Sequence, residues 1–337
     1  MTPKLLLVLP CYNEEAILRI TDAKLNAFYD TLISSGVISP ESKICYVNDG
    51  SRDTTWEIIE SLTAANQRLL GVKLSRNFGH QNALLAGLFE YKGLFDCYIS
   101  IDADLQDDVN AIIPMLEKFK EGAAVVYGVR DDRSSDTFFK KFTAEMFYKV
   151  MQWLKVPVIF NHADFRLLDN RVLEELENYR EVNMFIRGII PTIGLKNDKV
   201  FYKRLEREAG ETKYPLKKML TFAWNGVTSF SIMPMRFVLW FGALSFVLSA
   251  LLAVYVLYTK FAGVTTAGWT STLLMMAFFN GSNMLAIGLI GEYIGKIYEE
   301  VKARPRYIVE KSTALALRQA QGALRQAQGD RDNLTGN

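Results

Sequence analysis

The feature that most restricts the fold is a long stretch without charge in the second half of the chain. From Phe237 to Thr259, 23 consecutive residues include no Asp, Glu, Lys or Arg. At a rise of about 1.5 Å per residue, a helix of this length crosses the hydrocarbon core of a bilayer. A second uncharged run follows Lys260, and its later part, residues 271–290, predicts a second span. We therefore expect a transmembrane hairpin within residues 236–295, with a buried helical hairpin in a soluble protein as the alternative.

The basic residues around the hairpin predict its orientation. Lys260 lies between the two uncharged runs, and the other basic residues lie outside them: Lys217, Lys218, Arg236, Lys296, Lys302, Arg304 and Arg306. Because Lys and Arg are enriched on the cytoplasmic side of membrane proteins, we expect both termini in the cytosol. The predicted location is the cytoplasmic membrane, crossed more than once.

The segments that flank the hairpin differ from it in composition. Residues 201–235 mix lysines with Leu, Phe and Trp, which is typical of an amphipathic segment at the membrane interface. Residues 296–337 predict a cytosolic tail with the low-complexity repeat LRQAQG at 317–322 and 324–329. Small residues in the second run, such as Gly281 and Gly288, suit close helix packing and favour a homo-oligomer as a hypothesis.

Residues 1–200 alternate between apolar strands and helical patterns. This alternation predicts an α/β domain with a Rossmann-like, mainly parallel sheet covered by helices on both faces. Five strands are expected, at residues 4–10, 43–47, 72–74, 98–101 and 125–127.

The overall composition argues against several classes of function. A formal net charge of +2 over 337 residues disfavours nucleic-acid binding, because such domains are normally strongly basic. Neither GxGxxG nor GxxxxGKS/T occurs, so dinucleotide and P-loop sites lose their main support. Cys11, Cys45 and Cys97 form no CxxC pair and are expected to be buried thiols.

Polar clusters follow four of the predicted strands. They are Asn13–Glu14, Asn48–Asp49, Arg76–Asn77 and residues 102–106. In open α/β sheets the carboxyl ends of the strands form the ligand crevice. We therefore expect the four clusters to converge on one site.

The stretch YISIDADLQDD carries the strongest chemical signal. If the strand continues through it, Asp102 and Asp104 point to the same side, and Gln106 adds a neutral oxygen. Hard oxygen ligands without nearby His or Cys suit Mg²⁺ or Mn²⁺, and such sites are commonly completed by substrate phosphates. The alternative is a solvated acidic helix start, a role that we assign to Asp107 and Asp108.

Several ordered motifs carry a family resemblance. The segments VLPCYNEEAIL, YVNDGSRDTTWEII, LSRNFGHQNALLAGL, SIDADLQDD and ADFRLLD are similar to those of the inverting glycosyltransferases of family 2. Within that family they resemble the polyprenyl-phosphate glycosyltransferases, namely dolichol-phosphate mannose synthase and, more closely, the bactoprenol glucosyltransferases. The resemblance covers about residues 4 to 310, including GETKYPLKK and both uncharged runs. Ala163 stands where many relatives have glycine, and Asp164 directly follows it.

The resemblance implies a GT-A fold and a role for each matching residue. Asp164 would be the catalytic base, and Arg130 and Lys213 would neutralise phosphate groups. Asp102, Asp104 and Gln106 would hold Mg²⁺ or Mn²⁺ at the diphosphate, with Asp104 essential for turnover. The residues that would contact the nucleotide or phosphates are Pro10, Tyr12, Glu14, Asp49 and, with less support, Arg166 and Arg207.

The implied activity is transfer of a hexose from a nucleotide sugar to a polyprenyl phosphate at the membrane. UDP-glucose and undecaprenyl phosphate are the first choices, and transfer from GDP-mannose or UDP-aminoarabinose are alternatives. A non-catalytic nucleotide-sugar sensor also stays open, although it would be expected to lose its acidic ligands. The absence of a QxxRW sequence disfavours a processive polysaccharide synthase.

Overall fold

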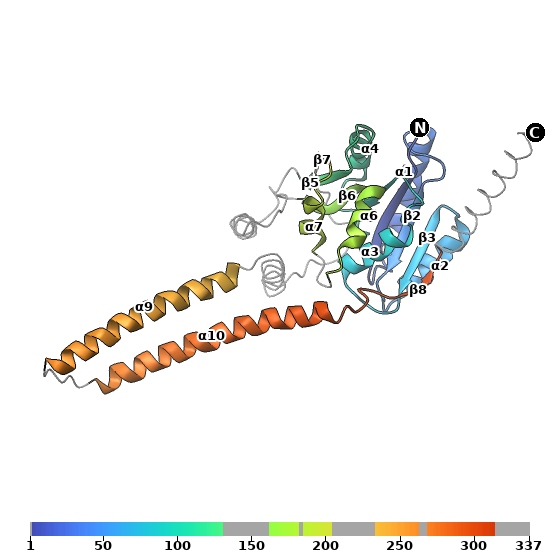
Figure 1. Ribbon diagram of the computed structural model, residues 1–337. Helices are drawn as coiled ribbons and strands as arrows, with labels where there is room; N and C mark the ends of the chain where they lie inside the picture. The colour runs from blue at the N-terminus through green and yellow to red at the C-terminus, as the bar shows by residue number, and fades with distance from the viewer. Residues whose placement is uncertain (1, 131–161, 182–184, 204–232, 263–267, 314–337) are drawn as a thin grey trace, which may run out of the picture. The chain divides into compact units, whose positions relative to one another are not determined.

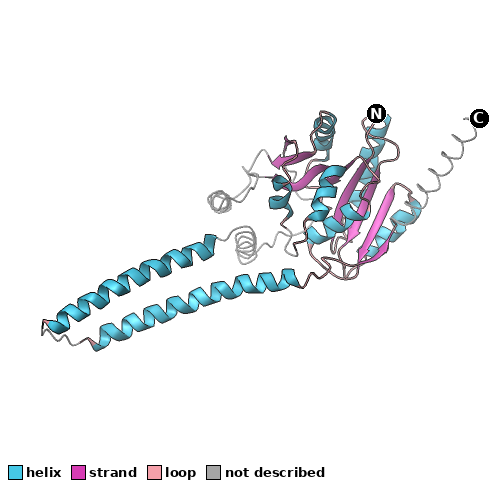
Figure 2. Cartoon of the chain, viewed as in Figure 1, coloured by secondary structure: helices cyan, strands magenta, loops and turns pink. Residues whose placement is uncertain are grey.

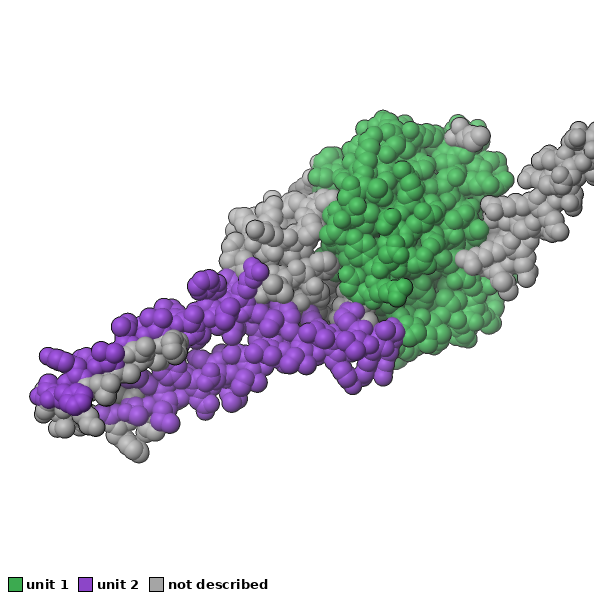
Figure 3. Space-filling model, viewed as in Figure 1, with its two compact units in different colours: residues 1–148, 157–213, 305–337 green, residues 149–156, 214–304 purple. Residues whose placement is uncertain are grey.

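The computed structural model describes residues 2–130, 162–181, 185–203, 233–262 and 268–313. The chain divides into two compact units, coloured separately in Figure 3. One unit comprises residues 1–148, 157–213 and 305–337, and the other comprises residues 149–156 and 214–304. The predicted interfacial segment lies largely outside the described residues, as does the LRQAQG repeat.

The first unit is an α/β structure built on one eight-stranded sheet (Figures 1 and 2). Its strands are β1 (Leu5–Cys11), β2 (Lys43–Asn48), β3 (Leu69–Leu74), β4 (Cys97–Ser100), β5 (Val125–Arg130), β6 (His162–Asp169), β7 (Asn197–Tyr202) and β8 (Val309–Ser312). Its helices are α1 (Leu18–Ser34), α2 (Thr55–Ala65), α3 (His80–Glu90), the short 3-10 helix η1 (Val109–Ala111), α4 (Ile112–Lys120), α6 (Asn170–Asn178) and α7 (Ile186–Thr192).

The sheet is mixed, with the order β7-β5-β6-β4-β1-β2-β3-β8. Strands β4, β1, β2 and β3 are parallel neighbours, as the strand–helix alternation predicted. Every residue of β1 is buried, which is the pattern of a strand covered on both faces. All five predicted strands are present, and β3 begins earlier than expected, at Leu69.

Three strands were not predicted, and two of them change the topology. Strand β6 runs antiparallel between β4 and β5, so the fourth and fifth predicted strands are not neighbours. At the other side of the sheet, β8 runs antiparallel to β3. The hydroxyl of Thr313, just after β8, accepts a hydrogen bond from Gly71 N at 3.1 Å and lies 2.8 Å from the Tyr91 hydroxyl.

Two long helices make up the described part of the second unit. They are α9 (Met233–Phe261) and α10 (Trp269–Val301), and they contain the two predicted spans, 237–259 and 271–290. Phe241 and Phe278 pack edge to face across them, with ring centroids 6.4 Å apart. Many of their large apolar side chains are exposed, among them Trp240 at 73% and Leu285 at 79%. Within the described residues, no helix reaches the length and apolar character that crossing a membrane requires.

Candidate functional site

The acid loop, defined as residues 102–106, follows β4 at the carboxyl edge of the parallel strands. Strand β4 ends at Ser100, so the expected strand geometry through Asp102 and Asp104 is not present. A turn replaces it, in which Leu105 has φ of +45° and Gln106 N donates to Asp104 Oδ1 at 3.3 Å. Asp102 and Asp104 are half-buried and Gln106 is buried. The predicted cluster is therefore present, although a turn rather than a strand forms it.

The donor set of the acid loop fits a magnesium-type site in its chemistry. Two carboxylates and one amide oxygen are hard ligands, and such a site keeps several positions for water and substrate phosphate. Desolvation raises the pKa of Asp102, and the nearby carboxylates of Asp164, Asp107 and Asp104 add to that rise. A divalent cation would relieve this gathered negative charge. Among the described residues, no group of three or more His, Cys, Asp or Glu side chains is placed to hold a metal ion.

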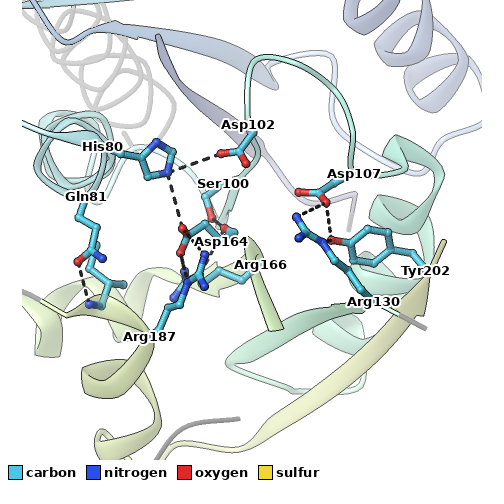
Figure 4. A network of polar contacts seen from close by, with 11 residues as sticks. His80, Gln81, Ser100, Asp102, Asp107, Arg130, Asp164, Arg166, Arg187 and Tyr202 are labelled. Atoms are coloured by element: carbon cyan, nitrogen blue, oxygen red, sulfur yellow. Dashed lines mark hydrogen bonds and ion pairs between the residues drawn. The ribbon is translucent and has the colours of Figure 1, made fainter. Parts of the chain in front are cut away.

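Strand β6 brings Asp164 and Arg166 to the same edge of the sheet. Because β6 is antiparallel to β4, with Ser100 opposite Arg166, its first residues lie beside the end of β4. The Ser100 hydroxyl donates to the backbone carbonyl of Asp164. Arg166 is fully buried, and its guanidinium donates to the Asp164 carboxylate. Both predicted residues therefore lie at the site, with the Arg166 guanidinium beside the Asp164 carboxylate (Figure 4).

Two further residues of this cluster were missed by the sequence analysis. Arg187, near the start of α7, donates to Asp164 from Nε at 3.1 Å and from Nη2 at 2.8 Å. His80, which opens α3, has its Nε2 atom 3.6 Å from Asp102 Oδ1 and 3.7 Å from Asp164 Oδ2 (Figure 4). A lone arginine in the apolar stretch FIRGII was a usable signal for Arg187. For His80, the signal was its position directly after Gly79, at the start of the helical pattern that follows the third strand.

Arg130 lies at the end of β5, as predicted, but it is already paired within the protein. Its Nη2 donates to Asp107 Oδ1 at 3.1 Å, and its Nε donates to the Tyr202 hydroxyl at 3.3 Å. That hydroxyl donates to the same Asp107 oxygen at 2.6 Å. Asp107 is only 1% exposed, so the prediction that it is a solvated residue of a helix start was wrong. Asp108 does cap η1, by accepting a hydrogen bond from Asn110 N.

This difference between two adjacent aspartates gives a direct test. We expect Asp107→Asn to lower the free energy of unfolding by about 2 kcal/mol, because it removes a buried carboxylate that accepts from a guanidinium. Asp108→Asn is expected to change it by a few tenths of a kcal/mol at most, since Asn caps a helix as well as Asp does. Thermal unfolding of the two variants measures the difference. Equal melting temperatures would contradict the assignment.

The predicted nucleotide contacts lie in two loops that follow β1 and β2. Pro10 is buried, Glu14 is half-buried and Tyr12 is 40% exposed. Hydrogen bonds fasten the two loops together, including Asn13 N to Ser51 Oγ at 3.0 Å and Glu14 N to Thr55 Oγ1 at 2.9 Å. These hydrogen bonds therefore hold the backbone in place at the ends of β1 and β2, where the nucleotide contacts are predicted.

Asp49 connects the second loop to the loop before α3. Its carboxylate accepts hydrogen bonds from Phe78 N at 2.7 Å and from Gly79 N at 2.9 Å. Burial raises the pKa of Asp49, and these two hydrogen bonds oppose that rise. Asp49 thus holds the loop that leads into His80, and its predicted contact with the nucleotide stays a prediction.

Gly50 allows these two loops to approach each other. A Cβ atom at this position would lie 2.2 Å from the backbone carbon of Arg76, and φ is +62°. Gly36 has a similar φ of +68° but no atom within 4 Å of such a Cβ. We expect Gly50→Ala to cost at least about 2 kcal/mol more stability than Gly36→Ala, because only Gly50 adds a backbone clash to the left-handed strain. Thermal unfolding of both variants tests this, and equal losses would count against the close approach.

Arg207 and Lys213, the remaining predicted phosphate-binding residues, lie outside the described residues. The structure therefore brings together Asp102, Asp164 and Arg166, and it adds His80 and Arg187 to them. Asp104 and Gln106 lie with Asp102 in the acid loop. Arg130 belongs to a neighbouring cluster with Asp107 and Tyr202. The roles predicted for these residues stay predictions.

Comparison with known proteins shows to which family the chain belongs. Residues 6–177 match the family described as Glycosyl transferase family 2. The chain is 50% identical over 308 residues to the "Uncharacterized glycosyltransferase YkoT" of Bacillus subtilis, covering 91% of each chain. It is 38% identical over 312 residues to the "SfII prophage-derived bactoprenol glucosyl transferase" of Shigella flexneri, covering 92% of this chain and 98% of that one.

Solved structures of more distant proteins are also similar. Glucosyl-3-phosphoglycerate synthase from Mycobacterium tuberculosis, solved with Mn²⁺, UDP and phosphoglyceric acid, has a TM-score of 0.43 and 15% identity. The match covers 67% of this chain and 76% of that one. The family is established by the sequence comparisons: the family model matches the first half of the chain, and the relatives match nine tenths of it. The chain belongs to glycosyltransferase family 2.

Proposed function

We propose that this protein is a membrane-bound, inverting glycosyltransferase that moves a hexose from a nucleoside diphosphate sugar to a polyprenyl phosphate. UDP-glucose is the donor that we favour and undecaprenyl phosphate the acceptor. The family membership establishes a transferase. The donor, the acceptor, the divalent metal and the inverting course are parts of the proposal.

One observation carries the proposal. The acid loop and the arginine-bound Asp164 lie at the same edge of one sheet, and His80 lies between them (Figure 4). An acidic loop suits a metal-bound diphosphate, whereas adjacent arginines suit anionic oxygens. Both kinds of group are needed where an anionic donor meets an anionic acceptor.

The chemistry requires little proton transfer from the acceptor. A phosphate monoester has a second pKa of about 6, so near neutral pH it carries most of its negative charge already. One of its oxygens attacks the anomeric carbon opposite the leaving group. The bond from that carbon to the diphosphate oxygen breaks, and its electron pair leaves with the diphosphate. Mg²⁺ or Mn²⁺ held by Asp102, Asp104 and Gln106 would offset the charge that develops on the diphosphate. We expect leaving-group stabilisation to be the larger contribution to the rate.

The lipid acceptor accounts for the apolar helices. Each buried CH₂ contributes about 0.8 kcal/mol to holding a polyprenyl chain in the bilayer, so the enzyme has to work at the membrane surface. The exposed apolar side chains of α9 and α10 suit contact with lipid. The two spans, the cytosolic position of both termini and the cytoplasmic membrane location remain predictions within this proposal.

The names of the relatives support the choice of substrate. Relatives from Shigella flexneri and its phages are named bactoprenol glucosyl transferases, at 37% to 38% identity over nine tenths of the chain. These names favour a glucose donor and a polyprenyl acceptor for this chain.

The test is a transfer assay with the full chain in membranes. Radiolabelled UDP-glucose, GDP-mannose and UDP-aminoarabinose are each supplied with undecaprenyl phosphate, before and after chelation with EDTA and after addition of Mg²⁺ or Mn²⁺. We expect label in the lipid fraction from UDP-glucose, lost on chelation and restored by metal. Full-speed transfer after chelation would remove the metal from the proposal. Donor binding without transfer to the lipid would identify a sensor instead.

A further inference from the structure

Asp164 is held by cations on more than one side. Its Oδ1 accepts from Arg166 Nη2 and Arg187 Nε, and its Oδ2 accepts from Arg187 Nη2. The Asp164 side chain is 15% exposed. Burial alone would raise its pKa, but the two guanidinium groups outweigh burial and hold the pKa well below its usual range. A carboxylate in these surroundings is a poor proton acceptor near neutral pH.

Arg187 is held in place by a contact between two helices. The side-chain oxygen of Gln81, in the first turn of α3, accepts a hydrogen bond from Ile186 N at 3.3 Å. Ile186 is the first residue of α7 and directly precedes Arg187. The same turn of α3 begins with His80, which faces Asp164 (Figure 4). The sequence HQ in α3 therefore contacts Asp164 through His80 and the residue before Arg187 through Gln81.

The charge of this cluster differs from that around Arg130. Arg166, Asp164 and Arg187 together carry a net charge of +1, whereas the charge of Arg130 is matched by Asp107. With a divalent cation offsetting Asp102 and Asp104, this net positive charge would favour the approach of an anionic substrate group. Arg187 forms a bidentate ion pair with Asp164. The single ammonium group of lysine does not reproduce this geometry.

From these contacts we propose that Asp164 is an anionic anchor for two arginines, not a proton acceptor, and that Arg187 is a positioning residue of the reaction centre. The inference rests on the proposed function, since it concerns how that site handles an acceptor that arrives already ionised. Asp164 and Arg187 then act as one unit. Removing either side chain displaces the other.

The test is a double-mutant cycle on sugar transfer, with Asp164→Asn, Arg187→Ala and the two combined. We expect Arg187→Ala to lower kcat by about 10²-fold, as for a displacement of about 1 Å within the reaction centre. The double variant should be about as active as the weaker single variant, because partners in one unit are not additive. Methylguanidinium in solution should raise the sugar-transfer activity of Arg187→Ala at least about tenfold. The Arg187→Lys variant should regain less activity than that.

Arg171→Ala is the matched control. Arg171 also pairs with an aspartate through Nε and Nη2, namely Asp169, but its side chain is 62% exposed. We expect this variant to transfer sugar at the normal rate and to be unaffected by methylguanidinium. A merely structural role for Arg187 predicts no chemical rescue.

Two outcomes would overturn the inference. One is losses from Asp164→Asn and Arg187→Ala that multiply in the double variant, as expected for a separate base and a separate cation. The other is absence of rescue by methylguanidinium. Failure of the proposed function is distinguishable, because it would be seen in the wild-type protein as absence of transfer to lipid phosphate. The double-mutant cycle would then be measured by the rate of donor hydrolysis.

Discussion

Asp104→Ala is expected to lower sugar transfer by about 10³-fold or more, which is the upper range for removing one group that stabilises developing charge. Asp104 lies in the acid loop, where its Oδ1 accepts from Gln106 N. In the proposed mechanism its removal would leave one carboxylate and one amide for the metal, and the charge on the departing diphosphate would no longer be offset. The measurement is label transfer to undecaprenyl phosphate, together with Mn²⁺ binding in the presence of UDP by titration calorimetry. Both are expected to fall.

Asp108→Ala provides the control for this prediction. Asp108 is four residues further along and caps η1 without belonging to the acid loop. We expect it to cost about 1 kcal/mol of stability through the lost cap and to leave Mn²⁺ binding intact. An Asp104→Ala variant that binds Mn²⁺ normally while losing activity would show that Asp104 acts in another way.

Arg166→Met is expected to produce the largest loss of stability, about 3 to 5 kcal/mol, because it removes one partner of a buried ion pair. Arg166 has no exposed surface, and its guanidinium donates to Asp164. For a unit of this size, such a loss lowers the melting temperature by on the order of 10 °C. Thermal unfolding followed by circular dichroism measures it.

The exposed pair of Arg171 and Asp169 again supplies the comparison. Arg171→Met removes the same charge from a surface ion pair, and such pairs contribute at most about 1 kcal/mol. Similar melting temperatures for the two methionine variants would mean that burial of Arg166 contributes little.

The local parts of the fold and site were predictable from the sequence. Apolar runs such as Leu5–Cys11 specify buried strands, and strand–helix alternation specifies parallel neighbours, as β1, β2, β3 and β4 confirm. Polar residues that directly follow strands were therefore placed at one edge. This reasoning located Asp49 and Asp102 correctly, because both depend on where a strand ends.

Features that depend on pairing between distant segments were not predictable in this way. Nothing within HADFRLLD indicates that it inserts antiparallel between β4 and β5. Likewise, Asp107 lies in an acidic stretch that is typical of a helix start, and its burial depends on Arg130 and Tyr202, which are 23 and 95 residues away. Arg187 was overlooked for the same reason, since its partner Asp164 is 23 residues earlier in the chain. Tertiary pairing overrode the local pattern in each case.

The antiparallel strand β8 has a consequence for how the chain is synthesised. Gly71 in β3 and its partner Thr313 are 242 residues apart, an interval that takes roughly 10 to 50 s at ribosomal elongation rates. During that time the β3 side of the nascent sheet lacks its last strand, and an unpaired sheet edge invites association with other chains. The sheet of the first unit therefore cannot be completed until β8 has been synthesised, after both α9 and α10.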